Sequence, residues 1–72
     1  MAQPVHFDIH PRALRRLTRR QIVEAEVEYV LANFAGSRRN GVIQGRTIAG
    51  RELKIEVRDQ GPYLMVMDVK AT

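Results

Sequence analysis

Residues Arg51 to Arg58 read Arg-Glu-Leu-Lys-Ile-Glu-Val-Arg, and this stretch decides the fold. Every second residue from Leu53 to Val57 is apolar, and the residues between and around them are charged. Such alternation is typical of a strand that buries one face and exposes the other. The stretch therefore predicts a half-buried strand with Leu53, Ile55 and Val57 turned toward the core.

Two more strands are expected on either side of this one. The first runs from Val42 to Ile48 and reaches it through the turn Ala49-Gly50, and the other runs from Tyr63 to Val69 after the turn Asp59 to Pro62. Short turns of this kind join antiparallel neighbours into a meander. The last strand is apolar on both faces, which predicts a central position. Its alternation assigns Tyr63, Met65, Met67 and Val69 to one face and Leu64, Val66 and Asp68 to the other.

The first half of the chain predicts a short strand and two helices. The strand covers Val5 to Ile9, and Pro11 then starts a helix through Arg19, since proline suits the first helical position. A second helix is expected from about Val23 to Asn33, and Thr18-x-x-Gln21 fits a capping box at the break between the helices. The buried sides of the helices would carry Ala13, Leu14 and Leu17, and Val27, Val30, Leu31 and Phe34. A loop with Arg38-Arg39 at its centre follows, from Asn33 to Gly41.

These elements define a fold class and a cellular setting. The 72 residues predict one α+β domain of order β-α-α-β-β-β, with both helices packed on one face of an antiparallel-rich sheet. The chain has no cysteine, no apolar stretch of about 20 residues that could span a membrane, and no start typical of a signal peptide. We therefore expect a cytoplasmic protein without a membrane partner.

The charge is basic and unevenly distributed. The formal net charge is +4, and five of the ten arginines lie between Arg12 and Arg20, followed by Glu24, Glu26 and Glu28. A basic helix favours polyanionic partners such as RNA, or an acidic protein. The alternative, equally weighted, is that the two oppositely charged segments neutralise each other. A helix-turn-helix DNA reader is disfavoured, because the second helix, which would read the bases, is acidic.

Four short motifs lie between Arg16 and Val57: Arg16-x-x-x-Arg20-x-Ile22, Glu26-Val27, Gly45-Arg46-Thr47 and Gly50-Arg51-x-Leu53-x-Ile55-x-Val57. Together they resemble a small bacterial domain-of-unknown-function family grouped with the RelE- and BrnT-type toxins. The chain departs from the family pattern at two positions. Arg12 stands where the family usually has histidine, and Val23 stands where serine or threonine is common.

The resemblance implies a RelE/BrnT-like fold and a place in a toxin–antitoxin module. Toxins of the wider group cleave RNA and are silenced by an antitoxin encoded beside them. Metal-independent RNA cleavage needs a base, an acid and cations near the phosphorus. His6 and His10 are the only side chains that ordinarily titrate near neutrality. His10 is the candidate base or phosphate ligand, although capping of the helix start before Pro11 is the more common role for such a residue.

The remaining candidate site residues come from the predicted sheet and the first helix. Arg51 and Lys54 would stabilise the phosphate during catalysis, and Tyr63 would stack on a base or donate a proton. Each has a simpler alternative: cross-strand ion pairs for the cations, since Glu52 and Glu56 share the face of Lys54, and a packing role for Tyr63. Further phosphate contacts are predicted for Arg12, Arg16, Arg46 and Arg58.

Other chemistries are not supported by the sequence. The two histidines and scattered carboxylates have no metal-ligand spacing, and no phosphate loop, dinucleotide fingerprint or nucleophile turn is present. We expect neither a metal nor an organic cofactor. The rival hypothesis is a non-catalytic interaction domain that uses its doubly apolar last strand to bind a partner protein or a second copy of itself, in a homodimer.

Overall fold

The alternating stretch forms strand β3, Glu52–Asp59, in a computed structural model that describes residues 6–34 and 40–72. Leu53, Ile55 and Val57 are each at most 1% exposed, which confirms that the predicted face of this strand is buried. The intervening Lys54 and Glu56 are exposed. One face of the sheet is therefore core, and the other, which we call the open face, is charged.

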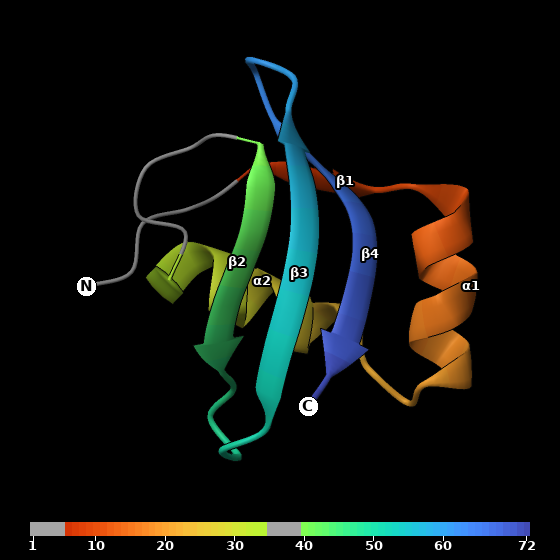
Figure 1. Cartoon of the computed structure of the whole chain (residues 1–72), viewed down its shortest axis with the longest axis vertical. Coiled ribbons are helices and arrows are strands. Elements are labelled where there is room, and N and C mark those ends of the chain that lie inside the picture. The colour runs from red at the N-terminus through yellow and green to blue at the C-terminus, as the bar shows by residue number, and fades with distance from the viewer. Residues whose placement is uncertain (1–5, 35–39) are drawn as a thin grey trace.

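The sheet has four strands and mixed pairing. The other strands are β1, Phe7–Ile9, β2, Gly41–Arg46, and β4, Leu64–Ala71. Their spatial order is β1-β4-β3-β2, so the meander lies on one side and the first strand is added beside the last (Figure 1). The β1–β4 pair is parallel, whereas β2–β3 and β3–β4 are antiparallel. The α+β class is as expected; the parallel pair was not predicted.

The two helices have different positions. Helix α2, Glu24–Phe34, lies across one face of the sheet, while α1, Pro11–Arg19, lies beside β4, on the side where β1 ends (Figure 1). We expected both helices to cover the same face of the sheet. Helix α2 does so, whereas α1 lies beside β4 (Figure 1). The buried apolar side chains form one cluster, which comprises Ala13, Leu17, Ile22, Val27, Val30, Leu31, Leu53, Ile55, Val57, Leu64, Val66 and Val69.

Strand β4 contains an irregularity that corrects the sequence prediction. Glu56 is paired with Asp68, but the next residue, Val57, is paired with Val66, so Met67 is an extra residue in β4. A β-bulge of this kind reverses the alternation beyond it. Val69 is therefore buried together with Val66 rather than opposite to it, and Asp68 lies on the open face. The predicted assignments of Val69 and Asp68 are wrong for this reason.

The break between the helices also differs from the prediction. Thr18 lies inside α1, where its hydroxyl donates to the carbonyl of Leu14 at 3.3 Å, so it does not cap a second helix. Instead, the backbone N–H of Val23 donates to Glu26 Oε1 at 3.1 Å. This contact is one half of a capping box, supplied by the third residue of α2. The sequence pattern that marks the start of α2 is therefore Val23-x-x-Glu26.

Strand β2 is shorter at its end than predicted, because Thr47 starts the turn. The Gly50 N–H donates to the Thr47 carbonyl at 2.9 Å, and Gly50 has φ +86°, a left-handed conformation that favours glycine. Ile48, expected in the strand, lies in this turn and is 85% exposed. Phe34 is 46% exposed, and its ring lies over Gly45, where a Cβ atom would approach it to 2.4 Å. Val5 and the Arg38-Arg39 pair lie outside the described residues.

Candidate nucleic-acid interface

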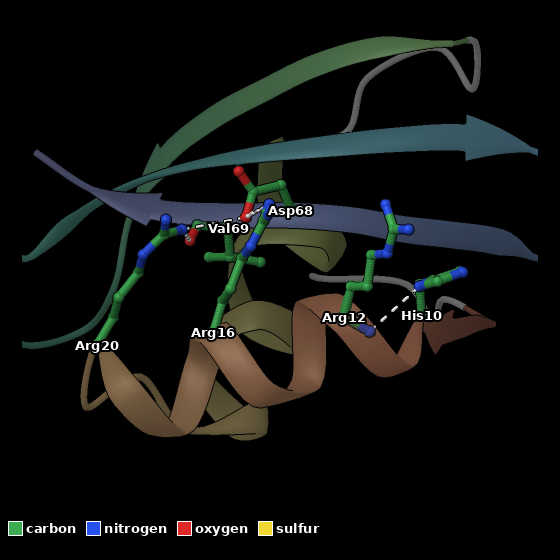
Figure 2. Close-up of polar contacts among 6 residues, drawn as sticks. All are labelled: His10, Arg12, Arg16, Arg20, Asp68 and Val69. Atoms are coloured by element: carbon green, nitrogen blue, oxygen red, sulfur yellow. Dashed lines mark hydrogen bonds and ion pairs between the residues drawn. The ribbon is translucent and has the colours of Figure 1, made fainter.

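Helix α1 and its C-cap residue, Arg20, carry three arginines at intervals of four residues. Because a helix turns once every 3.6 residues, Arg12, Arg16 and Arg20 share one side of α1. Figure 2 shows their side chains rising from this side toward β4. The adjacent, buried side of the helix is formed by Ala13 and Leu17. The row of arginines therefore borders the open face of the sheet.

Asp68 on β4 receives two of the three guanidinium groups. Its Oδ1 lies 3.3 Å from Arg16 Nη1 and 3.0 Å from Arg20 Nη1. Arg20 Nη1 also donates to the carbonyl of Val69 at 2.5 Å (Figure 2). The bulge at Met67 is what turns Asp68 toward these arginines. We call Arg16 and Arg20 the anchored arginines.

The pKa of Asp68 is lowered below the ordinary value of 3.8. Burial of the carboxyl group acts in the other direction and is the largest single effect, since it disfavours the charged form. The hydrogen bond from Arg16, the charge of Arg20 and the backbone N–H of Val69 together outweigh it. Asp68 is therefore an anion at neutral pH, and it holds α1 against the sheet.

The other three arginines of α1, Arg12, Arg15 and Arg19, are exposed. Within residues 6–34 and 40–72, no carboxylate lies within 4.0 Å of their guanidinium groups. In particular, the predicted neutralisation by Glu24 and Glu28 does not occur there, because the ion pairs of α1 are made with β4 instead. We call these three the outward arginines. They provide a concentrated positive charge on a helix without a single acidic residue.

His10 caps α1. Its Nδ1 accepts a hydrogen bond from the backbone N–H of Arg12 at 3.2 Å, and Pro11 occupies the first helical position (Figure 2). The helix-start role weighed in the sequence analysis is thus confirmed. Since Nδ1 is the acceptor, the neutral ring carries its proton on Nε2, which can donate a hydrogen bond to a phosphate but cannot act as a base while the cap is formed.

Arg51 connects the junction of the two helices to the sheet. Its guanidinium group donates to the carbonyls of Gln21 at 2.8 Å and Arg20 at 3.0 Å, and it lies 3.6 Å from Glu26 Oε1. Helix C-terminal carbonyls lack partners within their own helix, so these contacts satisfy the end of α1. Arg51 therefore holds α1, α2 and β3 together.

The remaining cations of the sheet lie on its open face. Lys54 is opposite Lys70, Arg58 is opposite Met65, and Arg46 is opposite Glu52. Gln44 donates a hydrogen bond to Glu52. Lys54 lines a shallow hollow of about 130 Å³ together with Val42, Glu56, Asp68 and Lys70. This surface mixes both signs of charge, in contrast to the outward arginines.

The four residues predicted to be catalytic are not brought together. His10 binds β4 through its N–H at Val66, whereas Lys54 is opposite Lys70, four residues or about 13 Å further along the strand. Arg51 lies beyond Lys54, at the far end of α1. Tyr63, which is half-buried, precedes β4 at the other end. These positions do not form one pocket among the described residues.

Sequence reasoning missed two participants of the arginine cluster, Asp68 and Arg20. The available signal for Asp68 was a single carboxylate in an otherwise apolar strand, four residues after Leu64. A buried strand contains an acidic residue only when a cation is within reach. The arginine-rich helix was the evident source of such a cation.

Comparison with known proteins gives no relative. No family profile matches the chain, and no curated protein or solved structure matches it. Among the described residues, no group of three or more histidine, aspartate or glutamate side chains could hold a metal ion. Neither described helix is long and apolar enough to cross a lipid bilayer.

Proposed function

We propose that this chain binds RNA through the outward arginines of α1. The observation that carries the proposal is the division of the helix. Arg16 and Arg20 are held by Asp68, while Arg12, Arg15 and Arg19 are exposed without a carboxylate partner in the described parts of the chain. The anchored arginines fix the helix, and the outward arginines are then presented without internal competition.

The chemistry of arginine supports a phosphate ligand. The guanidinium group is planar and always charged, and it binds phosphate oxygens with paired hydrogen bonds. From Arg12 to Arg19 these groups span about 10 Å along the helix, enough to contact more than one phosphate of a strand. Neutralised phosphates release counterions, so binding of this kind weakens as salt increases.

The test is the salt dependence of binding to a single-stranded RNA of mixed sequence. Replacing Arg12, Arg15 and Arg19 by glutamine should reduce the slope of log affinity against log salt by about 2, since each phosphate contact contributes about 0.7. The free energy of unfolding should change little, because these side chains are exposed. Fluorescence anisotropy at several salt concentrations measures the slope.

A matched control removes three charges elsewhere. Lys54, Arg58 and Lys70 lie on the open face, and their replacement by glutamine changes the net charge by the same amount. An equal loss of slope in this control would mean that RNA responds only to the total charge. A wild-type slope in the arginine variant would contradict the proposal. Binding of an acidic protein but not of RNA would assign the surface to a protein partner.

We extend this proposal to RNA cleavage as part of a toxin–antitoxin module. It is supported by the resemblance of the motifs and by His10, whose Nε2 is not used in the cap and can donate a hydrogen bond to a phosphate. Asparagine also caps helices well but does not titrate, so His10→Asn separates the two roles. Growth arrest on induced expression, and metal-independent RNA cleavage that His10→Asn abolishes with the fold retained, would support the toxin function. RNA binding without cleavage would limit the function to binding.

A further inference from the structure

Strand β2 lies at the edge of the sheet. Within residues 6–34 and 40–72, β2 pairs only with β3, and no element forms a backbone hydrogen bond along its outer side. On the opposite side of the sheet, the outer edge of β4 is occupied. Strand β1 pairs with the start of β4, and further along β4 Arg20 donates to the carbonyl of Val69. An uncovered edge strand is a template for pairing with another chain.

The outward-facing backbone groups of β2 can be assigned from its pairing with β3. The Thr47 N–H donates to the Arg51 carbonyl, so Thr47 turns its backbone groups toward β3. In an antiparallel pair this orientation alternates, and Gly45 and Ile43 therefore also face β3. The N–H and C=O groups of the residues between them, Val42, Gln44 and Arg46, point away from the sheet.

We propose that the outer edge of β2 pairs with β2 of a second copy of this chain, antiparallel and centred on Gln44. In this register Gln44 lies opposite Gln44 of the second copy, and Val42 lies opposite Arg46. Each of these pairs exchanges two hydrogen bonds, so every outward backbone group of the three residues is used. The two sheets become one continuous sheet with a two-fold axis.

Other registers satisfy less of the edge. A two-fold axis at Ile43 pairs Val42 with Gln44 but leaves the outward groups of Arg46 outside the strand pairing. An axis at Arg46 places two guanidinium groups directly opposite each other, which is unfavourable. Only the register centred on Gln44 uses all outward groups and keeps like charges apart.

The side chains at this edge suit the same register. On the open face, Val42 is 62% exposed and would pack against the aliphatic part of Arg46 from the second copy. On the other face, Ile43 of the second copy lies opposite Gly45, which has no side chain to oppose it. The 46% exposed ring of Phe34 over Gly45 then gains an apolar neighbour.

Strand β2 also lacks the usual protection against pairing. Natural edges are blocked by proline, by lysine, by a bulge or by a charge that points inward. Between Gly41 and Arg46 there is no proline, lysine, bulge or inward charge, and the register with β3 is continuous; the one charged residue, Arg46, stands at the end of the strand and lies opposite Val42 in the proposed register. The bulge of this sheet is instead in β4, where it turns Asp68 toward Arg16 and Arg20.

The experiment measures the mass of the wild-type chain and its amide exchange together. Sedimentation equilibrium should give a mass that rises from monomer to dimer with concentration. Over the same range, the amide hydrogens of Val42, Gln44 and Arg46 should become protected from exchange. The amides of Ile43 and Gly45 are an internal control, since β3 already protects them in the monomer.

Gln44→Pro removes the central outward N–H, which edge strands tolerate, while Gln44→Thr keeps it as the matched control. The proline variant should weaken dimerisation by at least about tenfold, and the threonine variant should not. If Gln44→Pro does not fold, Val42→Lys provides the second test, because an exposed lysine blocks edge pairing.

Three outcomes would overturn the proposal. One is a wild-type chain that stays monomeric at every concentration, with fast exchange at Val42, Gln44 and Arg46. The second is a dimer in which these amides still exchange quickly, which would place the contact on another surface. The third is protection of these amides only when a strand from a different protein is added, which would assign the edge to that partner.

Discussion

The anchored and the outward arginines of α1 are the same residue type on the same short helix, yet they have different environments. Arg16 and Arg20 meet a carboxylate and a carbonyl of β4, whereas Arg12, Arg15 and Arg19 meet no carboxylate within the described ranges. The difference is produced by one residue of the facing strand. A basic stripe therefore cannot be assigned to a ligand as a whole, because part of it belongs to the fold.

The largest expected effect comes from removing the shared anion. Asp68→Ala leaves two guanidinium groups without their carboxylate and should reduce the free energy of unfolding by about 1.5–3 kcal/mol. Glu56 is a matched control: it lies directly opposite Asp68, is exposed, and makes no ion pair within residues 6–34 and 40–72. Glu56→Ala should cost less than about 0.5 kcal/mol. Equal costs in urea unfolding would remove the distinction between anchored and outward arginines.

A smaller effect should separate the two anchored arginines. Arg20 bonds both Asp68 and the Val69 carbonyl, so Arg20→Gln should cost about 1–2 kcal/mol. Arg16 contacts Asp68 at 3.3 Å without the carbonyl contact of Arg20, and its side chain is 45% exposed, which predicts less than about 1 kcal/mol for Arg16→Gln. Thermal and urea unfolding of both variants give the order. The reverse order would show that the carbonyl contact contributes little.

The smallest expected effect is the pH dependence of the contribution that Asp68 makes to the free energy of unfolding. Because the folded pKa of Asp68 lies below its ordinary value, its contribution to stability is fully present above the unfolded pKa, near 3.8, and is lost as the pH falls through the folded pKa. The wild-type advantage over Asp68→Asn should therefore be constant above about pH 5 and should shrink toward strong acid. A constant difference down to the lowest pH would indicate that the amide is as good a partner as the carboxylate.

The parts of the fold that depend on local patterns could be predicted from the sequence. The period-two alternation of Leu53, Ile55 and Val57 is set by strand geometry alone, and it correctly identified the buried face. The bulge at Met67 has no such signal, since one extra residue leaves the composition of the strand unchanged. The parallel pairing of Phe7 with Leu64 was equally hidden, because it joins segments from the two halves of the chain.

The candidate site was predicted less completely, for a related reason. Capping by His10 depends only on its neighbours Pro11 and Arg12, and the sequence indicated it correctly. The partners of Arg51 are the carbonyls of Gln21 and Arg20, which lie 30 and 31 residues earlier in the sequence and are not revealed by a local pattern. The RNA-binding and catalytic roles given to other residues remain predictions. Residue type indicates what a side chain can bind, whereas the fold determines what it already binds.

The place of Asp68 in the last strand has a consequence for synthesis. Helix α1, with its arginines, leaves the ribosome well before Asp68, which belongs to the last strand. Until that strand arrives, all five arginines of this segment lack the anion that later holds two of them. Sheets that require contacts between distant segments also fold slowly. The positive charge along α1 is therefore balanced by Asp68 only after the last strand has joined the sheet.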